Sequence, residues 1–190
     1  LDDDKDATVS PIYTFDEGLV FSGEYRQRFD KGEIEISGSI TEGDREVTEN
    51  GMTVTRKDQI RGHIQVEGEY DFNDTWRAGI DAARATDRTY LRRYNFFELG
   101  GDVLETNAYL EGFRDQTYAA ANIYSFQDLR TESRPDQPLI APLLQYSHIS
   151  KADRFGGRVL VDSDFRYLYR GDGPTTQRVS LRPGYEISHI

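Results

Sequence analysis

Residues 60–72, "IRGHIQVEGEYDF", alternate apolar or glycine residues with polar residues at every position. A period of two residues is typical of a β-strand, because successive side chains point to opposite faces of a sheet. Ile64 and Val66 would lie on an apolar face, and His63 on a polar one. Either a protein core or the hydrocarbon of a membrane must cover the apolar face, and the two alternatives imply different functions.

The same alternation recurs along the chain and predicts about ten strands separated by Gly, Asp and Asn turn signals. No segment sustains a helical period, so we expect an all-β, antiparallel up-and-down meander. The expected strands cover residues 7–15, 19–29, 33–41, 59–72, 75–85, 104–113, 117–129, 139–149, 155–170 and 177–190.

Strand and connection lengths favour a membrane barrel. Most strands are longer than the usual 5–6 residues of globular sheets and match the roughly 9–11 residues that cross a bilayer. Long polar connections are expected at 42–58, 86–103 and 130–138, and they alternate with short turns. Outer-membrane barrels combine short periplasmic turns with long outer loops. We therefore expect a partial transmembrane β-barrel that forms an open curved sheet in isolation.

Composition narrows the function classes. The net charge of −11 argues against nucleic acid as a partner, because phosphates attract Lys and Arg. The absence of Cys excludes disulfides and thiolate zinc sites in this segment. The chain starts with Leu and ends in "YEISHI", which still reads as strand, so we expect residues 1–190 to be a fragment of one barrel domain.

No catalytic or metal-binding pattern is evident. The histidines His63, His148 and His189 lack ligand-like spacing, and no serine lies in a nucleophile elbow. Glu67 and Glu69 are neighbours on one strand face, which alternation alone explains. We predict neither an enzyme nor a bound metal or cofactor.

Charged side chains occur in the middle of the expected strands, on their polar face, and they need water or oppositely charged partners. A hydrated barrel lumen or the solvent face of a soluble β-sandwich that binds carbohydrate would supply the water. These charges include Glu67 and Glu69, Arg26 and Arg28, and Asp162 and Asp164.

The stretch "DRTYLRRYNFF", residues 87–97, places Arg88, Arg92 and Arg93 around Tyr90 at the expected outer rim. This suits an aromatic girdle with basic residues above it. The arginines could bind anionic lipid phosphates or sugar acids through charge-assisted hydrogen bonds. Alternatively, they pair with acidic residues of their own loop.

Pro11 lies in the first expected strand. Proline removes a ladder donor and belongs at sheet edges or bulges, so we expect it to weaken pairing with a neighbouring strand.

The ordered series "ATVSPIYTF", "RGHIQVEGEYDFNDTWRAGIDAARATDRTYLRRYNF", "LETNAYLEGF", "PLIAPLLQYS" and "QRVSLRPGYEI" resembles the barrel region of the LptD family. These are lipopolysaccharide-assembly proteins of the Gram-negative outer membrane, also called OstA or organic solvent tolerance proteins. The resemblance implies a barrel of about 26 strands, of which this chain is the N-terminal part. It also implies an upstream periplasmic jelly roll that receives lipopolysaccharide from an LptA-like bridge, and an LptE-like lipoprotein that plugs the lumen.

The family pattern assigns roles to residues of this chain. Pro11 matches the proline of the first strand, which forms one side of a lateral gate for the lipid. The resemblance implies transport without covalent chemistry, in which sugars pass along a hydrated lumen and acyl chains leave through the gate. The polar side chains that would face this lumen are Glu24, Arg26, His63, Glu67 and Glu69. A porin-like diffusion channel and the soluble carbohydrate-binding β-sandwich are the alternatives.

Overall fold

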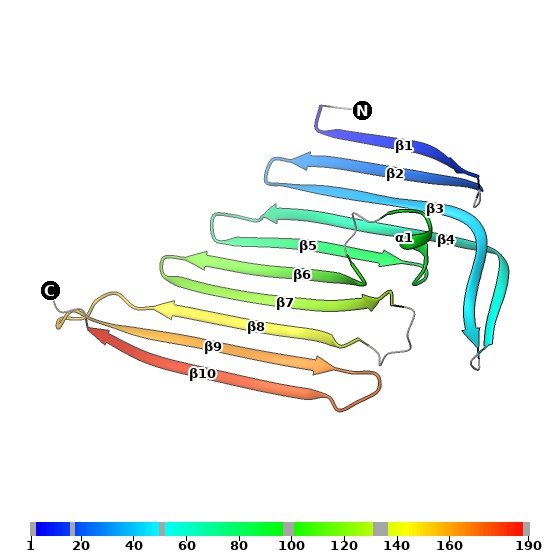
Figure 1. The fold of residues 1–190 in the computed structure, drawn as a ribbon. Coiled ribbons are helices and arrows are strands. Elements are labelled where there is room, and N and C mark those ends of the chain that lie inside the picture. Colours follow the sequence, from blue (N-terminus) through cyan, green and yellow to red (C-terminus); the bar gives the residue numbers. More distant parts are fainter. Residues whose placement is uncertain (1–2, 16–17, 50–51, 97–100, 131–136, 188–190) are drawn as a thin grey trace. The chain divides into compact units, whose positions relative to one another are not determined.

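The computed structural model describes residues 3–15, 18–49, 52–96, 101–130 and 137–187, which form ten antiparallel strands and one short helix. The strands lie in a single sheet in chain order, from β1 to β10 (Figure 1). The predicted all-β, up-and-down meander is therefore confirmed. The elements are β1 (Lys5–Thr14), β2 (Gly18–Phe29), β3 (Gly32–Glu49), β4 (Met52–Asp71), β5 (Trp76–Ala85), α1 (Tyr90–Arg93), β6 (Val103–Arg114), β7 (Thr117–Asp128), β8 (Leu139–Ile149), β9 (Gly157–Tyr169) and β10 (Thr176–Ile187).

The sheet is open within the described residues, since β1 and β10 each have one neighbour. All the described strands belong to this one sheet, so they do not form the two packed layers of a β-sandwich. The sandwich alternative is wrong for this part of the chain. No helix among these residues is long and apolar enough to cross a membrane.

The expectation of a long polar loop at 42–58 is wrong. Described residues of this segment extend β3 and β4, so the two strands form a hairpin that bends away as it continues (Figure 1). Val47, Thr53 and Val54 are β-branched, which favours the extended backbone despite the many charged neighbours.

The strand registers confirm the alternation of faces. Pro11 lies opposite Phe21, which lies opposite Ile40, and these residues share the apolar face. On the polar face, Arg26 lies opposite Asp6 on β1 and Glu35 on β3. The apolar face is bare: Ile60 is 72% exposed and Val179 is 73% exposed. Such a surface is expected where hydrocarbon covers the sheet.

The chain comprises two compact units. The first contains residues 1–68, 82–104 and 127–133, and the second contains residues 69–81, 105–126 and 134–190. The buried apolar cluster belongs to the first unit and gathers around α1. Its members are Val20, Ala83, Ala85, Tyr90, Leu91, Tyr94, Leu104 and Leu129.

In the second unit, one carboxylate organises the turn between β8 and β9. Asp153 accepts hydrogen bonds from the backbone N–H of Phe155 at 2.7 Å and of Gly157 at 3.0 Å. It also accepts the Tyr185 hydroxyl of β10 at 2.6 Å. These bonds, that of Tyr185 foremost, lower the pKa of the Asp153 carboxyl below its usual value.

Candidate functional site: the capped polar face

Polar side chains on the same face pair within a strand and across neighbouring strands. The guanidinium of Arg26 lies 3.2 Å from the carboxylate of Asp6 and 3.1 Å from that of Glu24. The side chains of this trio are between 39% and 55% exposed, so the charges remain hydrated. Two of the predicted polar-face residues, Glu24 and Arg26, thus contact each other.

The second unit has a similar network. Arg77 of β5 lies 2.8 Å from Asp71 and 3.5 Å from Glu69. The hydroxyl of Tyr109 on β6 donates to Glu69 at 3.1 Å. Gly79 makes room for the Tyr109 ring, because a Cβ there would lie 2.3 Å from it. Glu67, by contrast, is exposed and accepts a hydrogen bond from Gln65.

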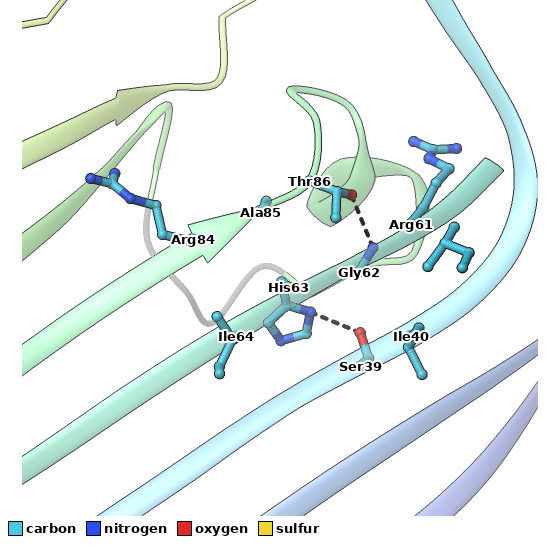
Figure 2. Close-up of a pocket in the computed structure, with 10 residues that line it drawn as sticks. Ser39, Ile40, Arg61, Gly62, His63, Ile64, Arg84, Ala85 and Thr86 are labelled. Atoms are coloured by element: carbon cyan, nitrogen blue, oxygen red, sulfur yellow. Dashed lines mark hydrogen bonds between the residues drawn. The ribbon is translucent and has the colours of Figure 1, made fainter. Parts of the chain in front are cut away.

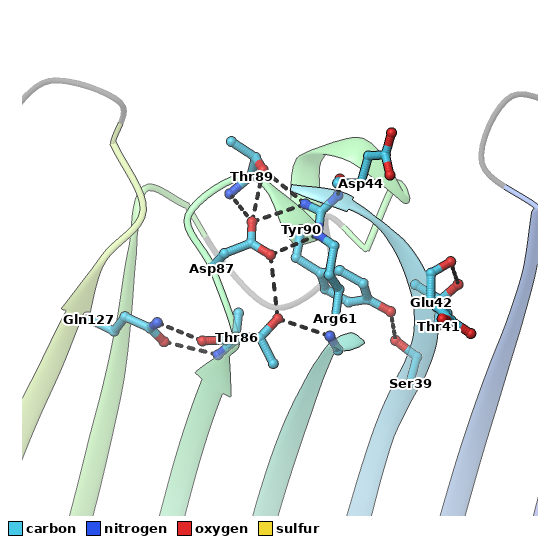
Figure 3. Close-up of polar contacts among 12 residues, drawn as sticks. Ser39, Thr41, Glu42, Asp44, Arg61, Thr86, Asp87, Thr89, Tyr90 and Gln127 are labelled. Atoms are coloured by element: carbon cyan, nitrogen blue, oxygen red, sulfur yellow. Dashed lines mark hydrogen bonds and ion pairs between the residues drawn. The ribbon is translucent and has the colours of Figure 1, made fainter. Parts of the chain in front are cut away.

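A different arrangement occurs where the chain leaves β5. Described residues 86–96 fold back over the polar face of β3 and β4 and carry α1 with them (Figure 3). We call residues 86–96 the cap. The cap covers Arg61 of β4 completely, leaving its side chain 0% exposed and that of Asp87 4% exposed.

Arg61 has partners on every side. Its Nε and Nη2 donate to the two carboxylate oxygens of Asp87 at 2.8 and 3.0 Å, which is a bidentate ion pair. Nη2 also donates to the hydroxyl of Thr89 at 2.9 Å, and Nη1 donates to the carbonyl of Asp44 at 2.9 Å. The rings of Tyr90 and Tyr94 lie 5.7 and 5.6 Å from the guanidinium carbon. A buried charge needs such complete pairing, since desolvation is otherwise prohibitive.

Asp87 also shapes the cap. Its Oδ1 accepts the backbone N–H of Thr89 at 2.9 Å and the Thr89 hydroxyl at 2.8 Å, an Asx turn that leads into α1. Burial alone would raise the pKa of the Asp87 carboxyl. The hydrogen bonds from Arg61 and Thr89 outweigh burial and lower this pKa to about 2, so the carboxyl is ionised at neutral pH.

A second contact line joins the cap to β3 and β4. The hydroxyls of Tyr90 and Ser39 lie 2.6 Å apart, and the Ser39 hydroxyl lies 2.8 Å from Nδ1 of His63. Burial raises the pKa of the Tyr90 hydroxyl, which keeps it neutral. Asn95 has a φ of 60°, which turns the chain after α1, and Phe96 packs 4.6 Å from the His63 ring.

The base of the cap is fixed by backbone bonds. The N–H of Thr86 donates to the carbonyl of Gly62 at 2.9 Å, and the N–H of Gly62 donates to the Thr86 hydroxyl at 3.0 Å. The Gln127 amide bonds both the N–H and the carbonyl of Ala85, at 2.9 and 2.7 Å (Figure 3). The exit of β5 is thus held at a fixed position.

The structure changes the interpretation of residues 87–97. Tyr90 is 0% exposed and Tyr94 is 8% exposed, so these aromatic residues are the interior of the cap and not a lipid-facing girdle. Arg88, Arg92 and Arg93 are exposed. Arg92 lies 3.4 Å from Asp102, so for this arginine the structure shows pairing with an acidic residue of its own loop. Phe97 lies outside the described residues.

Pro11 has a defined position in the β1–β2 ladder. The N–H of Arg28 donates to the carbonyl of Asp4 at 2.7 Å, and the register places these two residues opposite each other. Directly bonded pairs alternate with unbonded pairs in an antiparallel ladder. Even-numbered residues of β1 therefore bond to β2, and the backbone nitrogen of Pro11 points to the open edge. The missing donor leaves the β1–β2 register uninterrupted, and the expected weaker pairing stays a prediction for the other side of β1.

The sequence pattern did not single out four residues of this site, which are Ser39, Arg61, Asp87 and Gln127. The paired residues are far apart in the chain, and each looks like an ordinary polar residue in its own segment. The "D-x-T" spacing of Asp87 and Thr89, which suits an Asx turn, is the one local signal. No cluster of potential metal ligands occurs among the residues that the structure describes.

A single antiparallel up-and-down sheet with one bare apolar face and one charged face is typical of part of an outer-membrane β-barrel. Residues 59–189, more than half of the chain, match the family described as LptD, LPS transport system D. The chain belongs to the LptD family, whose members act in lipopolysaccharide transport at the outer membrane. The family match supports a general role in lipopolysaccharide transport. No curated protein matches the chain.

Proposed function

We propose that this chain is the part of a lipopolysaccharide translocon that contains one side of its lateral gate. Sugars travel along the polar face, which lines a hydrated lumen, while acyl chains leave at the open edge of β1 into the outer leaflet. The proposed activity is transport and involves no covalent chemistry. Residues 1–190 belong to one barrel domain in the outer membrane of a Gram-negative bacterium.

The position of Pro11 is the observation that carries this proposal. Its nitrogen lies on the side of β1 that faces away from β2 and cannot donate a ladder bond there. Any strand that closes the barrel against β1 therefore lacks one backbone hydrogen bond at the level of Pro11. A seam with fewer backbone bonds opens at lower cost than its neighbours.

The polar face supports passage of sugars without tight binding. Glu24, Arg26 and Glu69 are partly exposed and already paired with neighbouring side chains, and Glu67 is exposed. These groups can exchange hydrogen bonds with passing hydroxyls and phosphates. His63 lies under the cap. We expect it to line the edge of the lumen. We expect the exposed Arg88, Arg92 and Arg93 to contact anionic lipid phosphates or sugar acids.

The partners follow from the same proposal. Lipopolysaccharide arrives through an upstream jelly roll from an LptA-like bridge, and an LptE-like lipoprotein occupies the lumen. A plugged translocon of this kind would not conduct ions when reconstituted alone, whereas a porin-like channel would.

Two substitutions test the gate by changing the number of backbone N–H donors on the open edge of β1. Pro11→Ala in the full-length protein restores an outward N–H, so we expect a tighter seam, less lipopolysaccharide at the cell surface and changed antibiotic permeability. Val9→Pro removes a second donor from the open edge of β1 and should have the opposite effect on the seam.

Ser10→Pro is the matched control, because it removes an N–H that bonds Ser22 of β2 and should impair assembly instead of gating. Unchanged surface lipopolysaccharide and unchanged antibiotic permeability in both Pro11→Ala and Val9→Pro would rule out a gate at β1.

A further inference from the structure

A groove of about 320 Å³ opens on the sheet at β3, β4 and the end of β5, within the first unit (Figure 2). Ile40, Ile60 and Ile64 belong to the apolar parity of their strands and border it, together with Gly62. Arg84 and Thr86 border it at the end of β5. The groove also touches Ser39, Arg61 and His63, whose side chains belong to the polar parity and contact the cap from the opposite face of the sheet.

The floor of the groove is bare for a structural reason. A Cβ on Gly62, which lines the groove, would clash with the carbonyl oxygen of Ser39. A Cβ on Gly38, which is not among the lining residues, would lie 2.6 Å from the carbonyl oxygen of His63. The main chain of the neighbouring strand occupies this space, so neither position accepts a side chain. The depression is therefore built into the pairing of β3 with β4.

The walls are apolar and exposed. Ile40, Ile60 and Ile64 are 53%, 72% and 49% exposed. In an outer-membrane barrel this face contacts lipid, and a groove in it loses dispersion contacts unless a chain fills it. A volume near 320 Å³ is at the low end of the roughly 300–1,000 Å³ of ligand pockets, which suits one acyl chain and not a whole glycolipid.

A cation lies at one end of the groove. Arg84 is half-buried on the parity of β5 that otherwise carries Trp76, Ala78, Ile80 and Ala82. It is near the strand end, where the long connection to β6 begins, which is the outer side of such barrels. A guanidinium at the level of the head groups is suited to phosphate, which it binds with paired hydrogen bonds.

We propose that this groove binds one acyl chain of a lipopolysaccharide molecule while Arg84 contacts the phosphate of its lipid anchor. This inference rests on the proposed function, because it makes the transported lipid the occupant of the outer surface next to the translocon lumen. Apolar walls, a floor without side chains and a terminal cation together match a phosphorylated, acylated glycolipid.

The test places a photo-crosslinking amino acid at Ile60, Ile64 or Ile80 of the full-length protein in native outer membranes. Ile80 is the matched control, since it lies on the same face of β5 but outside the groove. We expect lipopolysaccharide adducts at positions 60 and 64 to exceed those at position 80 several-fold. Arg84→Gln should lower the adduct at position 60 several-fold, and Arg84→Lys should retain part of it.

Equal labelling at the three positions would show bulk lipid and overturn the proposal, as would adducts with phospholipid or with protein. Even if the Arg84 variants fail to assemble, crosslinking at positions 60, 64 and 80 in protein that keeps Arg84 still tests the proposal. A failure of this proposal can be distinguished from a failure of the gate proposal. The Pro11 and Val9 variants are assessed by the amount of lipopolysaccharide at the cell surface, whereas the groove is assessed by photo-crosslinking to lipopolysaccharide.

Discussion

Two arginines on the polar face, Arg61 in the first unit and Arg77 in the second, show what the cap changes. Both lie on the same kind of strand position and both pair with aspartate at 2.8 Å. The side chain of Arg61 is 0% exposed, whereas that of Arg77 is 41% exposed. The same ion pair is thus a buried anchor in one place and a hydrated surface contact in the other. Solvent access, and not pairing distance, decides what each pair does for the fold.

The largest difference is expected from Arg61→Met. Removing the guanidinium leaves the Asp87 carboxylate buried without its counter-charge, which typically costs about 3–5 kcal/mol. We expect the cap to detach, measured as faster proteolysis within residues 86–96 of the full-length protein in detergent. The double variant Arg61→Met with Asp87→Leu removes both charges and should recover much of the loss. If the single variant is as resistant as the wild type, the cap does not depend on this pair.

Lowering the pH should weaken the Arg61–Asp87 ion pair gradually, because it protonates the Asp87 carboxylate. The pKa of Asp87 is lowered from 3.8 to about 2 in the folded protein, so its contribution to stability is present above pH 4 and is lost as the pH falls through about 2. A spin label on the cap should therefore gain mobility between about pH 4 and pH 2. Asp87→Asn should remove this transition, and persistence of the transition in that variant would assign it to another group.

Tyr90→Phe should have an intermediate effect. It removes the hydrogen bond to Ser39 but keeps the ring that packs against Arg61, and Ser39 retains its contact with His63. A loss of about 1 kcal/mol in cap stability is expected, as for a typical buried hydrogen bond. Denaturant titration of proteolytic resistance measures it. A loss as large as that of Arg61→Met would contradict the ranking.

Arg77→Gln should have the smallest effect. Water already solvates this arginine and its partners Asp71 and Glu69, so losing the pair changes little. We expect an unfolding midpoint indistinguishable from that of the wild type. A clear shift would mean that the two arginines differ less than their exposure indicates.

Sequence reasoning located the strands well because alternation is a local signal with a fixed period. The β2–β3 register places Glu24 and Arg26 on the face that the pattern predicts. The extension of β3 and β4 was missed because charged residues interrupt the apolar parity there. The helix α1 has four residues, too few for a 3.6-residue period to be visible. The cap was missed because Arg61 and Asp87 are 26 positions apart and meet only after β4 and β5 have paired.

The contacts of Arg61 also impose an order on assembly. Its partners come from β3, through the carbonyl of Asp44, and from the segment after β5, through Asp87 and Thr89. The guanidinium can be sealed from water only once three consecutive strands are aligned. Until then it stays hydrated and the following segment stays unlatched, so a chain whose third to fifth strands are misaligned exposes this segment to quality-control proteases.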